Sequence, residues 1–207
     1  MSHPADIQKI SPTSLRTQAR MIEAVVDVVA QHGISGTTFA NVSAAAGVSQ
    51  GALVFHFKTK EGLLTETLSR LLQEYEQAWS AAFASPDPLE RILGLIRADF
   101  KPTICSRKKL ALWFSFWGEA GAQPLYNKIC VAAEDARHQA MLISCRALVE
   151  ATGGPDPELL TNSIDAFTDG LWLQMHIQSQ PITRAEALEQ ALAHLRLLLP
   201  QHAGRIV

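Results

Sequence analysis

Apolar residues recur at helical spacing along almost the whole chain, with glycine and proline between the helical stretches. No long segment combines strict alternation with an enrichment of β-branched residues, the pattern typical of a strand. The sequence therefore predicts an all-α fold. The predicted helices, nine in all, span about residues 14–32, 38–46, 50–57, 61–84, 88–101, 104–121, 124–152, 157–179 and 183–199.

A Ser-Pro-Asp-Pro segment at residues 85–88 interrupts this pattern, and a larger, more aromatic part of the chain follows it. Proline ends a helix because it lacks the backbone N–H and clashes with the preceding turn. Before the break, three helices are followed by a long one that starts near residue 61. We expect two domains, residues 1–60 and residues 61–207.

The composition is that of a globular protein, since 47% of the 207 residues are hydrophobic. The formal net charge of -2 argues against a protein that holds nucleic acid through bulk positive charge, so any DNA contact must rest on a local surface. Three widely spaced cysteines fit free thiols in a reducing compartment: Cys105, Cys130 and Cys145.

The start of the chain bears on localisation. The first residues, MSHPADIQKISPTSLRTQ, are polar and contain no apolar core of a signal peptide. No apolar run approaches the roughly 18 residues that span a bilayer. We therefore expect a cytoplasmic protein without a membrane partner.

Two short helices meet at the turn Ala46-Gly47-Val48-Ser49. Glycine supplies a tight turn there, and Ser49 can cap the second helix. Two short helices joined by such a glycine turn form a helix-turn-helix, a motif that places its second helix in the major groove of DNA. The inner face of the second helix is expected to hold Val48, Leu53 and Phe57.

The outer face of that helix then becomes available for DNA. Glutamine can pair with adenine, while alanine and phenylalanine can touch a thymine methyl group. The base-contact candidates are Gln50, Ala52, Phe55 and His56. Hydroxyls, backbone N–H groups and cations contact phosphates, which gives as further candidates Thr38, Ser49, Gly51, Lys58, Lys60, Arg16 and Arg20. A plain three-helix structural module is the alternative.

The stretch TTFANVSAAAGVSQGALVFHFKTKEGLL, Thr37 to Leu64, resembles the signature of the TetR-type repressors. The match is long and ordered, and it includes Gly47, Val48, Ser49, Gly51, His56, Phe57, Lys60, Leu63 and Leu64. The resemblance implies an N-terminal helix-turn-helix domain and a C-terminal helical domain for ligand binding and dimerisation. One departure is Val54, where the family often has a tyrosine that contacts the phosphate backbone.

A repressor of this type is expected to be a homodimer on a near-palindromic double-stranded DNA operator, because two half-sites about 34 to 36 Å apart then bind together. In the family the last helices pair with their counterparts in the partner. The last two helices here carry apolar stripes, which face either their own core or a partner: Leu160, Ile164, Phe167, Leu171 and Met175, then Leu188, Leu192, Leu195 and Leu198.

The segment LALWFSFWGE places Trp113 and Trp117 four residues apart on one helical face, with Phe116 beside them. Packing in the core is the simpler interpretation. The sharper one is an aromatic cage for a cation, since such cages recognise quaternary ammonium groups. Other helices could complete it with Tyr126 and Trp172, and with a counter-charge from Glu119, Asp165 or Asp169.

The runs LALWFSFWGEAGAQPLYNKI and DGLWLQ resemble the choline-sensing repressors of the glycine-betaine pathway, the BetI group. This resemblance implies a small-molecule effector, with choline as the candidate, and regulated genes of choline and glycine-betaine metabolism or transport. A different amine, drug or metabolite is the alternative effector. No cofactor is expected.

An enzyme is not expected, because the chain has no Gly-rich phosphate loop or nucleophile elbow and its histidines are scattered. The pair Asp135 and His138 has a carboxylate–histidine spacing that occurs in helical di-iron proteins, but those need two such pairs and two more glutamates. We interpret this pair as part of a solvated helix face and expect no metal. A helical interaction protein without DNA binding would leave the stretch from Thr37 to Leu64 unexplained.

Overall fold

The computed structural model describes residues 12–207, with side chains from Ser14 onward. This part of the chain forms nine α-helices and two short 3-10 helices and contains no strand, which confirms the predicted all-α class. None of the described helices is both long and apolar enough to cross a membrane. The expectation drawn from the polar start falls largely on residues 1–11, which lie outside the described residues.

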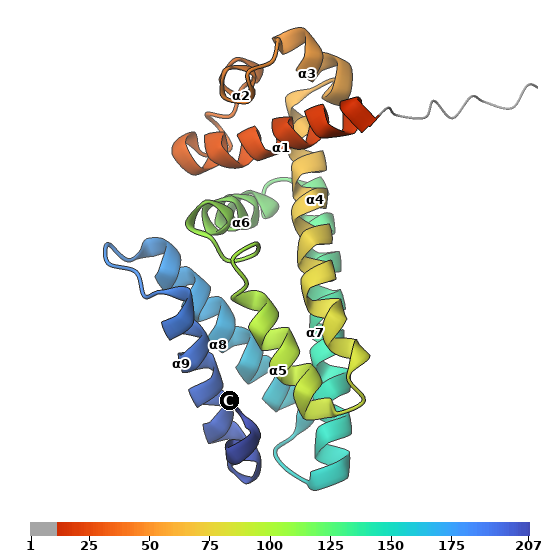
Figure 1. The fold of residues 1–207 in the computed structure, drawn as a ribbon, viewed down its shortest axis with the longest axis vertical. Coiled ribbons are helices and arrows are strands. Elements are labelled where there is room, and N and C mark those ends of the chain that lie inside the picture. Colours follow the sequence, from red (N-terminus) through yellow and green to blue (C-terminus); the bar gives the residue numbers. More distant parts are fainter. Residues whose placement is uncertain (1–11) are drawn as a thin grey trace, which may run out of the picture. The chain divides into compact units, whose positions relative to one another are not determined.

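The chain divides into two compact units, one up to Thr67 and one from Leu68 to Val207. The first unit holds α1 (Pro12–His32), α2 (Phe39–Ala46), α3 (Gln50–Phe57) and the start of α4 (Lys60–Ser80), as labelled in Figure 1. The boundary between the units falls within α4.

Local capping sets the helix ends of the first unit. Thr38 caps α2 by accepting a hydrogen bond from the backbone N–H of Asn41, and Ser49 caps α3 in the same way. Gly47 ends α2 in the left-handed conformation, with φ of 63°, which a residue without Cβ adopts at little cost. Gly47 and Ser49 are the turn and capping residues that the sequence indicated.

The turn between α3 and α4 requires a close backbone approach. A Cβ added to Gly62 would lie 2.3 Å from the carbonyl oxygen of Phe57, so this position leaves no room for a side chain. Packing of α1 against α2 and of α2 against α3 contributes to a core whose fully buried members include Met21, Val25, Val42, Leu53 and Leu63. Val48 is only half-buried and contributes less to the inner face of α3 than expected.

The second unit contains the rest of α4, the 3-10 helix Ala81–Ala84, α5 (Pro88–Asp99), α6 (Arg107–Ala120), α7 (Pro124–Thr152), α8 (Pro157–Ile177), α9 (Arg184–Leu198) and the 3-10 helix Pro200–Arg205. The helix expected over 61–84 is α-helical only to Ser80 and tightens into a 3-10 turn after it. The helix expected from residue 104 begins at Arg107, because Ser106 accepts the N-terminal hydrogen bond from Lys109.

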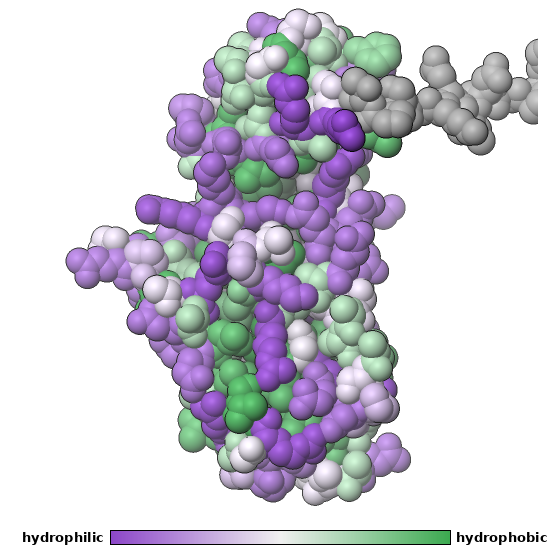
Figure 2. All heavy atoms as spheres, in the orientation of Figure 1, coloured by the Kyte–Doolittle hydropathy of each residue, from purple (hydrophilic) through white to green (hydrophobic). Residues whose placement is uncertain are grey.

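Helix α5 lies at the centre of the second unit. It packs against α7 and α9, while α7 also packs against α6 and α8, and α8 and α9 lie side by side (Figure 1). The predicted apolar stripes of α8 and α9 mostly face this core: Leu160, Ile164, Leu171, Met175, Leu192 and Leu195 are buried, and Phe167, Leu188 and Leu198 are half-buried. Figure 2 shows a mostly polar surface with apolar patches on the second unit.

Candidate functional site

The outer face of α3 carries most of the predicted base-contact residues. Gln50 is exposed and Phe55 is 71% exposed, an unusual exposure for a large apolar side chain, while Ala52 and His56 are half-buried. Leu53 is buried on the opposite face. The helix therefore presents an amide and an aromatic ring outward.

The hydroxyls expected to contact phosphate serve as helix caps. The oxygen atoms of Thr38 and Ser49 each accept a backbone hydrogen bond, at 3.1 and 3.2 Å. A hydroxyl also donates, so capping leaves each proton available for a phosphate oxygen. Gly51 is exposed, and a Cβ added to it would meet only Ser49 Oγ, at 3.8 Å. Packing within the first unit therefore does not require a glycine at this position.

Three of the predicted cationic phosphate contacts have partners inside the first unit. Lys58 Nζ donates to the Phe55 carbonyl at 2.9 Å and lies 5.4 Å from the ring centroid of that residue. Lys60 Nζ donates to the Ser35 carbonyl at 3.1 Å. Arg20 donates to the carbonyl of Ala46, the last residue of α2, at 2.8 Å. The fourth cation, Arg16, is exposed on α1.

The second unit contains a cavity of about 430 Å³ between side chains of α4, α6, α7 and α8. We call it the aromatic-acidic cavity. Its lining comprises Tyr75, Trp117, Glu134, Asp135, Arg137, His138, Asp165, Asp169 and Trp172. Of the residues predicted to bind a ligand, Trp117, Asp165, Asp169 and Trp172 lie in this lining.

Four aromatic rings cluster at the cavity. The Trp117 and Trp172 rings are nearly parallel, with centroids 6.3 Å apart and an interplanar angle of 19°. Trp113 is 1% exposed and contacts both rings, with its centroid 6.0 Å from each. Tyr75 contacts Trp113 and Trp172 at 5.7 and 6.0 Å. The indole N–H of Trp113 is buried and has no hydrogen-bond partner in the described part of the chain.

The other predicted ligand residues lie outside the lining. Phe116 is fully buried and packs edge to face on Tyr126, with centroids 5.3 Å apart. This pair belongs to the contact of α6 with α7, so core packing is the role that the structure gives both rings. Glu119 is half-buried near the end of α6 and does not line the cavity.

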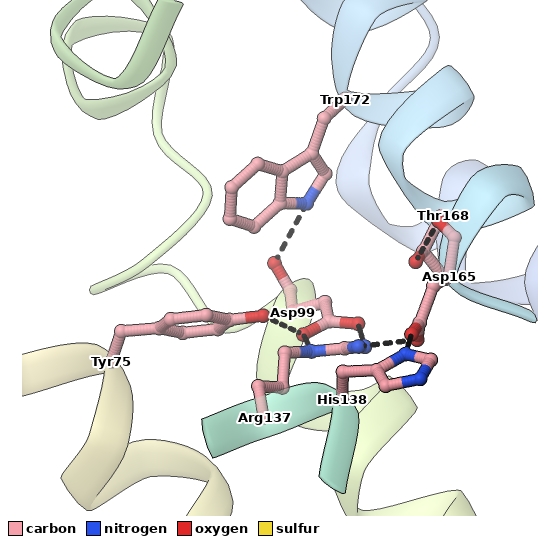
Figure 3. Close-up of polar contacts among 7 residues, drawn as sticks. All are labelled: Tyr75, Asp99, Arg137, His138, Asp165, Thr168 and Trp172. Carbon is pink, nitrogen blue, oxygen red and sulfur yellow. Dashed lines mark hydrogen bonds and ion pairs between the residues drawn. The ribbon is translucent and has the colours of Figure 1, made fainter. Parts of the chain in front are cut away.

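A buried ionic network forms one side of the cavity (Figure 3). The guanidinium of Arg137 donates twice to the carboxylate of Asp99, at 2.5 and 3.2 Å, and once to Asp165 at 2.5 Å. Tyr75 donates its hydroxyl proton to Asp99 at 2.7 Å, and the Trp172 indole N–H donates to the Asp99 carbonyl at 3.1 Å. The network thus ties together α4, α5, α7 and α8.

Electrostatics distinguish the members of this network. Burial alone would lower the pKa of Arg137, but the adjacent Asp99 carboxylate raises it well above its ordinary value, so the guanidinium stays charged. His138 Nδ1 lies 2.8 Å from the second oxygen of Asp165. Asp135 is exposed, as expected for a solvated helix face, and both Asp135 and His138 line the cavity. No cluster of metal-ligand residues occurs among the described side chains.

Sequence analysis missed Tyr75, Glu134 and Arg137. A signal for the last two was available, because residues three and four apart share one face of a helix. Glu134, Arg137 and His138 have this spacing on α7, and Asp165, Asp169 and Trp172 have it on α8. A charged stripe of this kind usually faces solvent, so the spacing alone does not predict burial.

Two family models match the chain. Residues 21–67 match the tetR family of bacterial regulatory proteins, and residues 88–200 match the C-terminal domain of BetI-type transcriptional repressors. The curated relatives include the transcriptional regulator BetI of Burkholderia thailandensis, 30% identical over 90% of this chain and 95% of the relative. BetI of Burkholderia lata is 27% identical over 88% of this chain and 93% of the relative.

Solved structures share the fold. A transcriptional regulator from Pseudomonas aeruginosa PAO1 has a TM-score of 0.72 at 23% identity, covering 98% of this chain and 99% of that one. A regulator from Saccharomonospora viridis, solved in complex with choline, has a TM-score of 0.76 at 19% identity, covering 88% and 96%.

The family and these relatives are transcriptional regulators and not enzymes, as the sequence predicted. The helix-turn-helix match and the match over most of the second unit together establish the assignment. The chain belongs to the TetR family of transcriptional repressors and is of the BetI type.

Proposed function

We propose that this protein is a homodimeric repressor that binds a near-palindromic operator through α3 and responds to choline bound in the aromatic-acidic cavity. The regulated genes would serve choline and glycine-betaine metabolism or transport in the bacterial cytoplasm. One observation carries the proposal: aromatic faces and unpaired carboxylates line the same cavity, which is the chemistry that recognises a quaternary ammonium group.

We assign DNA recognition to the N-terminal domain, residues 1–60. Gln50 and Phe55 are outward-facing groups suited to base edges, and Ser49 with Gly51 lies at the α3 N-terminus, where backbone N–H groups favour phosphate. Arg16 supplies an exposed cation. The internally bonded Lys58 and Lys60 would have to exchange those bonds for phosphate contacts.

We assign effector binding to the C-terminal domain, residues 61–207. Trp117 and Trp172 would contact the ammonium group through their faces, with Asp169 and Glu134 as counter-charges. The choline-bound Saccharomonospora viridis regulator and the BetI relatives support choline over other amines. Helix α4 contributes Tyr75 to the cavity and continues into the first unit, so a ligand that favours one packing of these helices can change DNA affinity.

The proposal is tested by fluorescence polarisation with labelled DNA from upstream of the protein's own gene, across a salt series and with choline in parallel. We expect tight, salt-dependent binding that saturating choline weakens. Trp117→Ala should reduce choline affinity about tenfold or more, since a desolvated cation–π contact is worth about 2 kcal/mol. Trp117→Phe, which keeps an aromatic face, should lose less. Operator affinity that choline leaves unchanged would contradict the effector assignment.

For the dimer, we propose an interface on the outward faces of α8 and α9. Leu159, Leu173 and Ile177 on α8 are 65%, 44% and 65% exposed, and Leu197 on α9 is 80% exposed. Leu197→Glu should therefore shift the protein from dimer to monomer in sedimentation velocity and weaken operator binding, because the half-sites would no longer be bound together. Val131→Glu, at an exposed position on α7, is the matched control. A dimeric Leu197→Glu protein would place the interface elsewhere.

A further inference from the structure

Carboxylates outnumber cations in the aromatic-acidic cavity. Of the four that line it, Asp165 is paired with Arg137 and contacts His138, both on α7, while Asp135 and Asp169 are exposed and Glu134 is half-buried. Glu134, Asp135 and Asp169 form no hydrogen bond or ion pair with the side chains that the structure describes. They approach the cavity from different helices, α7 and α8. The cavity therefore contains three carboxylates without a fixed partner, of which Glu134 and Asp169 act on each other electrostatically across two helices.

We propose that Glu134 and Asp169 together read the charge of the effector, and that a monovalent cation enters the cavity in exchange for a proton held by this pair. The inference rests on the proposal that this cavity is the effector site. A quaternary ammonium group balances one carboxylate. In its absence, two nearby carboxylates in a partly buried site are stabilised when a proton supplies the missing positive charge.

The surroundings of Glu134 favour its protonated form while the cavity is empty. Its pKa is raised to about 7, first by burial and then by the negative charges of Asp169, Asp99 and Asp165. Arg137 opposes this shift but is already engaged by two carboxylates. A proton on Glu134 is therefore readily gained and lost near neutral pH.

Asp169 lines the same cavity but is exposed, so its carboxylate is only partly desolvated. Burial raises its pKa to about 6, with a smaller contribution from the charges of Asp99 and Asp165 and an opposing one from Arg137. The positive charge of a ligand would lower the pKa of both carboxylates of the pair. Binding of a cation should thus release a proton.

Other titratable groups border the pair. Asp135 lines the same cavity, and the pKa of the Cys130 thiol on α7 is raised to about 11 by burial and by the charge of Glu134, so the thiol stays neutral. Tyr75, from α4, has a pKa raised well above its ordinary value, mainly by burial, and stays neutral. His138, on the same helix as Glu134, contacts Asp165. A proton on His138 would also weaken the binding of a cation, so a variant of this residue has to accompany the test.

The cation binds to the ionised form of Glu134, so its affinity is expected to rise with pH. At pH 8 Glu134 is largely ionised, whereas at pH 6 a group with a pKa of about 7 is only about one-tenth ionised. The Kd for choline is expected to be about tenfold higher at pH 6 than at pH 8. Calorimetry in two buffers of different ionisation enthalpy should detect proton release on binding near pH 7.

The variants isolate the pair. Glu134→Gln removes the charge at constant size, so it should weaken choline binding at pH 8 and reduce the pH effect to about twofold, the part left to Asp169. His138→Gln should retain the tenfold effect, as should Glu150→Gln, at an exposed carboxylate on α7 outside the cavity. Loss of the pH effect in His138→Gln and its persistence in Glu134→Gln would overturn the inference.

Ligands of different charge separate this inference from the proposed function. The carbon analogue of choline, with tert-butyl in place of trimethylammonium, should bind weakly and without pH dependence, and glycine betaine should be disfavoured by its carboxylate. Choline binding that is equal at both pH values supports the proposed function and overturns this inference. Binding of tetramethylammonium but not choline, with the pH effect present, supports this inference and overturns the assignment of choline as the effector. Binding of neither cation overturns both.

Discussion

Replacing Arg137 by methionine is expected to lower the free energy of unfolding by about 3–5 kcal/mol, because removing one partner leaves a buried charge uncompensated. The side chains of Arg137 and Asp99 are 6% and 2% exposed, and the guanidinium makes three hydrogen bonds to two carboxylates. Denaturant unfolding followed by circular dichroism, at one protomer concentration for all variants, measures the effect.

A matched variant on the same helix isolates burial from charge. Arg146 also pairs with a carboxylate, that of Glu158, but both side chains are more than half exposed, so Arg146→Met should change stability by less than about 1 kcal/mol. Adding Asp99→Asn to Arg137→Met should recover part of the loss, since a neutral amide is easier to bury than a carboxylate. A loss below about 1 kcal/mol in Arg137→Met would show that water or another cation compensates Asp99.

The helix boundaries could be predicted because their determinants are local. Gly33 and Gly47 end helices in the left-handed conformation, and Ser49 caps α3, so each boundary depends on a residue visible in the sequence. The prediction was wrong where two signals competed. Ser106 is a better cap than the residues before it, and the helix therefore starts three residues later than its apolar pattern suggested.

The cavity could be predicted only in part, because aromatic content does not specify which ring faces a ligand. Trp117 and Phe116 are adjacent on α6, yet the first lines the cavity and the second packs on Tyr126. Arg137 was missed for a tertiary reason. A charged residue can be buried when other helices, here α5 and α8, supply its ion-pair partners. No local sequence pattern indicates such tertiary partners.

Replacing Gln50 by alanine is expected to weaken operator binding by about 1–3 kcal/mol per half-site, and so by about 2–6 kcal/mol for a dimer, if its amide pairs with a base. Gln50 is exposed as the first residue of α3, so the substitution should leave stability within about 0.5 kcal/mol. Fluorescence polarisation against operators with single symmetric base changes measures both affinity and specificity.

The pattern of loss then distinguishes base reading from phosphate contact. Gln50→Ala should abolish the preference for one base in each half-site and leave the salt dependence unchanged, because no phosphate contact is lost. Arg16→Ala should weaken binding to all sequences and reduce the salt slope by about one per subunit. If Gln50→Ala keeps every base preference, α3 reads DNA through Phe55 and His56 or through DNA shape, and the exposed amide is only part of its solvated surface.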